Sequence, residues 1–302
     1  MEISILLAEQ ILAMFLTMAV GFGVVRAGLF KTEDSRIISN MVVYICNPCV
    51  VVHSFQIELT DDKIKGLMIA IGLSVVVHMV LIIGSEILSF IFHFNSIEKA
   101  SIIYTNAGYL VIPLVGAVLG EEWVFYTTAF ILVQTVLMWT HGVKLIGQEK
   151  ELNIRKILCN PNVIAMIIGI ALFALEIRLP TVVDSCVSGF GDMISPASMM
   201  VIGMVIGDVD LKWVFRQKRP YLICLLRLIV FPLIAVVAFA GLERSGIHPD
   251  AEYILMIVLI ATSAPAAAMI TQLAQIYGKD SRYASVINVM SVIFCIITMP
   301  VM

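Results

Sequence analysis

The chain has 302 residues, of which 60% are hydrophobic and only 14% are charged, and its mean hydropathy is +1.01. Soluble domains contain about 45–50% apolar and about 25% charged residues, so this composition excludes a water-facing shell around a core. The net charge of −3 gives no reason to expect nucleic acid as a partner. We therefore predict an all-α membrane protein, because backbone groups in lipid must pair within a helix or in a closed barrel.

Ten apolar stretches are each close to the length of about 20 residues that a membrane span needs. They lie at residues 4–25, 35–56, 66–92, 98–119, 122–146, 161–178, 182–207, 219–241, 251–276 and 281–302. With ten spans, fourteen of the 19 Lys and Arg residues lie in loops or at span ends on one side, and only Lys63, Lys65, Arg178 and Arg244 lie on the other. Because basic loops stay in the cytoplasm, we expect a multi-pass inner-membrane protein with both termini outside.

The longest connection, at about residues 147–160, divides the chain into two halves of five spans, residues 1–149 and 150–302. Five is an odd number, so two similar halves would insert in opposite orientations. Pro48 and Pro113 interrupt the second and fourth spans, and Pro196 and Pro265 interrupt the seventh and ninth at a similar separation. Paired interruptions indicate a secondary transporter built from inverted repeats. The alternative is that these prolines only kink helices in a bundle.

The fourth and ninth spans carry the strongest candidates for a binding site. The fourth contains Asn106, Gly108 and Pro113, and the ninth contains Ser263 and Pro265. Proline removes a helical hydrogen bond and disfavours the helical conformation of the preceding residue. Broken helices that meet in the membrane would expose N–H donors suited to a carboxylate. The alternative is two kinked helices whose backbone groups are satisfied by their neighbours.

A second pair of polar residues precedes prolines in other spans. Asn47 precedes Pro48 in the second span, and Ser195 precedes Pro196 in the seventh. Asn47 could line the substrate path, and the two prolines could act as hinges or kinks. A kink satisfied within its own helix explains them equally well.

A charge inside a membrane span is costly and points to function, and two ionisable residues are the clearest candidates. Arg227 lies in the eighth span and keeps its charge at any ordinary pH. It would either extend to the cytoplasmic surface or face a cavity and bind an anion. Glu86, in the third span, could pair with Arg227, carry a proton as a coupling group, or lie near the interface.

Taken in order, several stretches resemble the auxin efflux carrier family, which includes bacterial malonate and malate permeases and the plant PIN proteins. The matching stretches cover nearly the whole chain and are residues 38–48, 106–114, 160–169, 195–203 and 264–280. The large cytoplasmic loop of the long plant carriers has no counterpart here.

The resemblance implies ten helices in two inverted five-helix repeats, with broken helices four and nine crossing each other. It also implies an elevator-like movement, in which spans 3–5 and 8–10 form the transport domain and spans 1, 2, 6 and 7 form the scaffold. Asn106, Pro113 and Pro265 match the crossing helices of the family.

We therefore expect a secondary transporter of small organic anions, with no cofactor and no metal site. A proton gradient, a sodium gradient or the membrane potential acting on the anion would supply the energy. A homodimer is one of the assemblies that such a transporter could form. The motifs of serine hydrolases, zinc proteases and P-loop ATPases are absent from the sequence, so we expect no catalytic residues. The alternatives are a sodium-coupled carrier of the bile-acid type and a membrane receptor that transports nothing.

Overall fold

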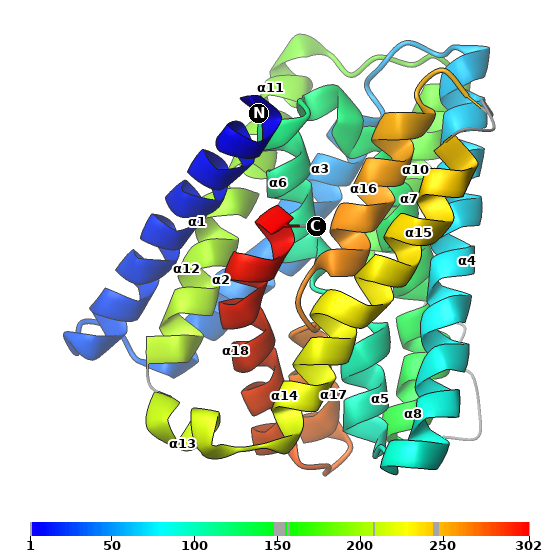
Figure 1. Ribbon diagram of the computed structural model, residues 1–302. Coiled ribbons are helices and arrows are strands. Elements are labelled where there is room, and N and C mark those ends of the chain that lie inside the picture. Colours follow the sequence, from blue (N-terminus) through cyan, green and yellow to red (C-terminus); the bar gives the residue numbers. More distant parts are fainter. Residues whose placement is uncertain (1, 148–154, 156–157, 208, 244–247, 302) are drawn as a thin grey trace. The chain divides into compact units, whose positions relative to one another are not determined.

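The computed structural model describes residues 2–147, 155, 158–207, 209–243 and 248–301. Within these ranges every regular element is a helix (Figure 1), and the one β-type contact is an isolated antiparallel bridge between Thr105 and Ala266. The prediction of an all-α protein is thus confirmed for the described residues. The chain divides into two compact units, which are described separately.

Unit 1 consists of three segments, Met1–Ile64, Gly108–Thr128 and Leu158–Leu211. Its helices are α1 (Glu2–Arg26), η1 (Thr32–Asp34), α2 (Ser35–Met41), η2 (Val42–Cys46), α3 (Asn47–Ser54), α6 (Ile112–Val118), η4 (Glu121–Trp123), α10 (Pro161–Ala174), α11 (Thr181–Asp192) and α12 (Ile194–Gly207). Two further helices, η3 (Ala107–Val111) and α7 (Val124–Leu137), are divided between the units, and the first residues of α4 (Asp61–Phe92) and α13 (Leu211–Arg216) also belong to unit 1.

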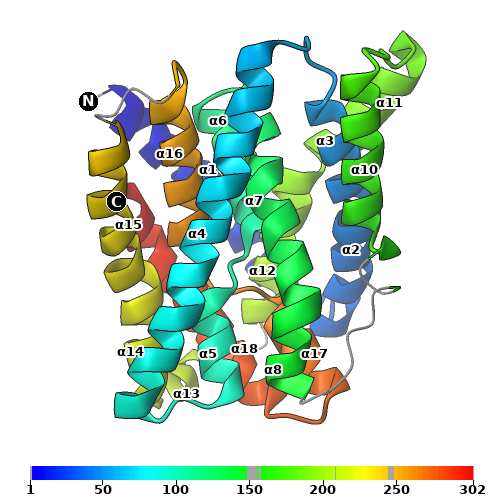
Figure 2. The same ribbon diagram turned by 90° about the vertical axis from the view of Figure 1, so that its right-hand side faces the viewer.

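Unit 2 consists of Lys65–Ala107, Ala129–Ile157 and Lys212–Met302. Its longest helix is α4, whose course is clearest in Figure 2. Its helices are α4 (Asp61–Phe92), α5 (Ser96–Ile103), η5 (Met138–Gly142), α8 (Val143–Gly147), α13 (Leu211–Arg216), α14 (Arg219–Leu225), η6 (Leu226–Val230), α15 (Phe231–Glu243), α16 (Ala251–Ser263), α17 (Met269–Ile276), α18 (Ser281–Thr298) and η7 (Met299–Val301).

Five helical stretches in the described part of the chain are long and apolar enough to cross a membrane. They are Thr32–Ser54, Asp61–Phe92, Glu121–Gly147, Thr181–Gly207 and Arg219–Leu242. Four shorter apolar helices are Leu16–Arg26, Pro161–Ala174, Ala251–Ser263 and Ser281–Cys295. The remaining stretch of the ten, residues 98–119, is divided among α5, η3 and α6. The count of ten membrane spans therefore stays a prediction.

Three prolines inside helical stretches are accommodated by the same local structure, a π-helical turn. Pro48, Pro113 and Pro232 are each the second residue of an α-helix that directly follows a five-residue π-helix. A proline ring clashes with the carbonyl group four residues before it and offers that carbonyl no N–H. The wider π turn accommodates this residue without ending the helix. The backbone stays helical through Cys46 and Asn47, so Pro48 does not break the second predicted span.

Glycines bring α1 and α12 into close contact within unit 1, where the two helices run side by side (Figure 1). A Cβ atom at Gly203 would overlap the backbone oxygen of Met18 and the backbone nitrogen of Phe22. A Cβ atom at Gly21 would overlap the carbonyl oxygen of Met200. Small residues that let two backbones approach in this way are a common means of packing helices in lipid.

We predict that Gly203→Ala destabilises the protein by about 1–3 kcal/mol, the usual cost of overpacking, because two backbones must move apart. Thermal unfolding of the detergent-solubilised protein measures this effect. Gly189→Ala on α11 is the matched control, since a Cβ atom there meets nothing within 4 Å. A Gly203→Ala variant that is as stable as the Gly189→Ala variant would show that the α1–α12 contact is looser than described.

Candidate functional site

Two apolar segments of unit 2 lose their helical conformation and pair with each other where they do so. α5 ends at Ile103, and α16 ends at Ser263 before α17 begins at Met269 (Figure 1). The Asn106 N–H donates to the Pro265 carbonyl at 2.8 Å, and the Ala267 N–H donates to the Tyr104 carbonyl at 3.0 Å. These two hydrogen bonds join the breaks as a short antiparallel ladder. We call residues 104–106 and 264–268 the paired breaks.

Side chains from two other segments satisfy the remaining backbone groups of the bridge. Gln134 of α7 accepts from the Thr105 N–H at 2.8 Å and donates to the Thr105 carbonyl at 2.9 Å. On α18, Ser291 accepts from the Ala266 N–H at 3.1 Å, and Asn288 donates to the Ala266 carbonyl at 2.7 Å. Sequence reasoning missed Gln134, Asn288 and Ser291, whose only signal is a polar side chain within an apolar stretch.

Three of the predicted site residues lie in or next to the paired breaks. Asn106, Ser263 and Pro265 are all buried in unit 2. The Ser263 hydroxyl donates to the Leu259 carbonyl at 2.8 Å, so its proton is held within its own helix. Ser263 can therefore offer a ligand only an acceptor while that bond persists.

Two other predicted residues meet in unit 1. A Cβ atom at Gly108 would lie 2.9 Å from the Asn47 side-chain nitrogen, so the Asn47 amide packs against the Gly108 backbone. Asn47 is 7% exposed, and its Oδ1 atom has no hydrogen-bond partner among the described residues. Pro113 is buried in the first turn of α6, in the same unit. Nothing observed here assigns these residues to a bound substrate, and that role stays a prediction.

Pro196, the second predicted hinge, occupies a different setting from Pro48. α11 ends at Asp192, and α12 begins at Ile194, so the seventh predicted span is interrupted just before the proline. Pro196 itself is exposed in the first turn of α12, where a missing N–H leaves no carbonyl without its bond. A role as a hinge stays a prediction for both prolines.

Arg227 is fully buried in unit 2 and binds the backbone of both broken segments. Its Nη1 donates to the Ile102 carbonyl at 2.9 Å, and its Nε donates to the Ala264 carbonyl at 3.2 Å. Its Nη2 has no hydrogen-bond partner among the described residues. Complete burial is incompatible with the interpretation that the side chain extends to the surface.

Glu86 does not pair with Arg227. Its carboxylate lies 2.7 Å from the Lys99 ammonium, and its side chain is 46% exposed. An ion pair with this exposure contributes about 0–1 kcal/mol to stability. A coupling role for Glu86 stays a prediction.

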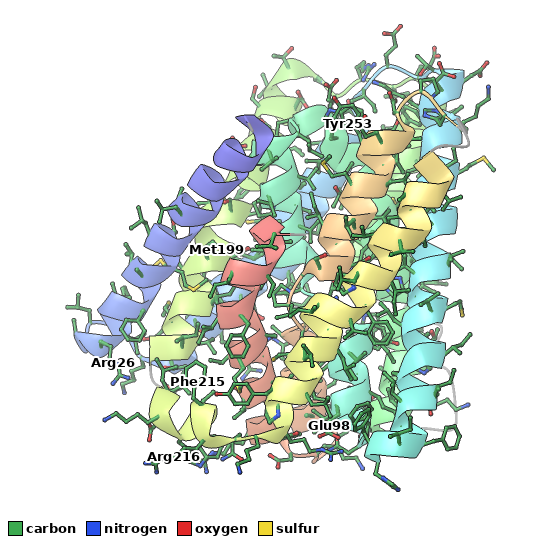
Figure 3. The ribbon with its side chains drawn as sticks, in the orientation of Figure 1. Arg26, Glu98, Met199, Phe215, Arg216 and Tyr253 are labelled. Carbon is green, nitrogen blue, oxygen red and sulfur yellow. The ribbon has the colours of Figure 1, made fainter. Side chains whose placement is uncertain are left out.

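A second buried charge fixes the start of α5. The Glu98 carboxylate accepts from both Arg219 of α14 and Tyr283 of α18, the latter at 2.7 Å. Its other bond comes from the Asn95 N–H, which it caps at 2.9 Å. Figure 3 shows Glu98 and Arg216 at one end of unit 2 and Tyr253 at the opposite end. Hydrogen bonds from Glu98 thus connect the N-terminus of α5 to α14 and α18.

The family described as Membrane transport protein matches the chain twice, over residues 6–154 and over residues 148–302. The chain belongs to this family. It is the auxin efflux carrier family, so the resemblance inferred from the sequence motifs is confirmed. The transporter is a multi-pass membrane protein that contains two copies of the family's repeat. A search of curated proteins found no match.

We predict that Gln134→Leu lowers the thermal stability of the transporter. The substitution leaves the Thr105 N–H and carbonyl without partners, and each buried unsatisfied group costs about 1–3 kcal/mol. Unfolding in detergent, followed by fluorescence, measures the loss. Gln272→Leu is the matched control, since Gln272 is exposed on α17. Equal stability of the two variants would mean that Gln134 is not needed to hold the break.

Proposed function

We propose that this transporter is a secondary carrier of small organic anions, in particular carboxylates, across the cytoplasmic membrane, with both termini outside. The observation that supports the proposal most directly is the pairing of the two breaks in unit 2. Non-helical backbone within a membrane occurs only where it is enclosed by protein or lines a cavity. The N–H groups of residues 105, 106, 266 and 267 are already bonded, so the free N–H donors predicted from the sequence are not found there. A solute at the paired breaks would instead bind side chains that this enclosed backbone holds in place.

Polar groups at the paired breaks support binding of a solute there. Asn106 is buried directly beside the backbone bond that joins the breaks. The neighbouring Thr105 hydroxyl is buried and has no hydrogen-bond partner among the described residues. A buried hydroxyl without a partner costs free energy unless a ligand or water satisfies it. We therefore add Thr105 to Asn106 as a residue expected to bind the substrate.

The charges of unit 2 favour an anion over a cation. Glu98 is held by Arg219, and Glu86 is held by Lys99. Arg227 adds a buried positive charge that has no carboxylate partner in the described part of the chain. Neither of these carboxylates is left free to bind a cation, and Arg227 offsets the negative ends of α5 and α16, so an anion is not repelled there.

The division of the chain supports an elevator-like mechanism, in which unit 2 carries the substrate. Unit 1 contains the segments predicted as scaffold, spans 1, 2, 6 and 7, and also Gly108–Thr128. Along the chain, unit 2 gives way to unit 1 between Ala107 and Gly108, directly after the first break. A rigid-body movement of one unit would therefore act on the chain next to the proposed site. A proton or sodium gradient would drive the cycle.

Uptake of labelled organic acids by proteoliposomes tests this function. We expect saturable uptake of at least one mono- or dicarboxylate, and none of organic cations of similar size. Strict dependence on sodium with a steroid-like substrate would favour the bile-acid-type carrier instead. A ligand that binds to the purified protein without net flux would favour a receptor and contradict the proposal.

We predict that Asn106→Ala lowers uptake about tenfold or more. Hydrogen bonds to a charged group contribute about 1.5–3 kcal/mol, and about 1.4 kcal/mol corresponds to a tenfold change in affinity. The backbone bond to Pro265 does not need the side chain, so the variant should fold. Asn40→Ala, at an exposed position on α2, is the matched control. Unchanged transport by Asn106→Ala would contradict the assignment of the site.

A further inference from the structure

We propose that Arg227 is a positioning residue that joins the C-terminal ends of α5 and α16 and cancels their negative charge, rather than a ligand of the substrate. The proposal about structure stands on contacts within unit 2 alone. Its consequence for transport rests on the proposed function. The two parts are therefore tested by separate measurements.

The hydrogen bonds of Arg227 connect the ends of two different helices. Ile102 lies in the last turn of α5, and Ala264 is the residue that follows the last turn of α16. The last four carbonyl groups of a helix have no partner within it. The guanidinium satisfies one such carbonyl of α5, at Ile102, through Nη1, and through Nε it binds the carbonyl of Ala264, the extended residue that caps α16. A planar group with fixed donor directions is suited to joining two carbonyls in this way.

The positive charge of Arg227 balances the negative ends of α5 and α16. The C-terminus of a helix carries about half of a negative elementary charge. Two such ends together match the single positive charge of Arg227, which has no carboxylate partner in the described residues of unit 2. The burial of an uncompensated charge would be very costly, so this balance explains how a fully buried arginine is tolerated.

The balance has a consequence for the substrate. Without Arg227, two negative helix ends would face the same enclosed region as the paired breaks and would repel a carboxylate. With Arg227 in place, these ends are neutral, and the region accepts an anion that Arg227 need not touch. Substrate binding through the unpartnered Nη2 is the competing interpretation, and it predicts no change in the empty protein.

Cys295 of α18 reports on this arrangement without any substrate. It is buried, and its Sγ atom lies 3.9 Å from the Ser263 carbonyl at the end of α16. Loosening of that helix end should expose the thiol. In a background that keeps Cys295 as the only cysteine, we would measure its rate of labelling by a maleimide for Arg227→Lys and Arg227→Gln. Arg216→Gln, at an exposed position on α13, is the matched control.

We expect Arg227→Gln to increase the labelling rate at least tenfold, and Arg227→Lys to increase it less than threefold because the charge is kept. Labelling of Arg227→Gln at the parent rate, or equal acceleration in both variants, would overturn the proposal. A second background with Cys46 of unit 1 as the only cysteine detects global unfolding. If Arg227→Gln exposes both thiols, the substitution has unfolded the protein, and the test then depends on Arg227→Lys. That variant keeps the charge, so the proposal requires that its Cys295 stays protected from the maleimide.

For transport, we expect Arg227→Gln to lower the maximal rate as well as raise KM, and Arg227→Lys to recover most of the rate. A change in KM alone, with Cys295 labelled at the parent rate, would identify Arg227 as a substrate ligand. If no organic acid is transported at all, the proposed function fails. The labelling experiment then still decides whether Arg227 joins the helix ends.

Discussion

The constraint on which the rest of this structure depends is that a backbone polar group enclosed in an apolar environment must have a hydrogen-bond partner. The chain meets this constraint in two ways. Where a proline lies within a helix, as at Pro48 and Pro232, a π turn absorbs it and the helix continues. Where the helix stops, the two breaks supply partners for each other, at Asn106 with Pro265 and at Ala267 with Tyr104. Only the second solution brings distant segments together.

The sequence locates the breaks but not their partners. Pro265 marks the second break directly, because a proline disfavours the helical conformation of the residue before it. Asn106 lies at the first break, but Pro113 does not interrupt the fourth predicted span itself, since it lies within α6 after the break. Gln134 and Ser291 lie 29 and 25 residues from the bridge residues that they bind. No local propensity tells which carbonyl a lone polar side chain will reach across a fold. The breaks also divide apolar stretches into short helices, so length alone does not count the spans.

The sequence likewise locates the charged residues but not the groups that compensate their charges. The sequence marks Arg227 as a costly charge, and the structure adds Glu98 as a second buried charge that is compensated by different means. Glu98 is compensated by a side chain, Arg219, near the end of unit 2. Arg227 is compensated by backbone carbonyls that become available only because α5 and α16 stop where they do. A search for acidic partners in the sequence therefore could not find the groups that stabilise Arg227, since helix ends are not residues.

In both repeats, side chains from a helix bind the backbone groups at the break, but the residue types differ between the repeats. In each repeat, polar side chains from a later helix hold the break: Gln134 binds Thr105 in the first, and Ser291 with Asn288 binds Ala266 in the second. The first break is followed by η3 and then by Pro113 in α6, whereas Pro265 lies inside the second break. An amide in one repeat and a hydroxyl with an amide in the other perform the same task. The two repeats therefore share the pairing of backbone groups at the breaks more closely than the side chains that support it.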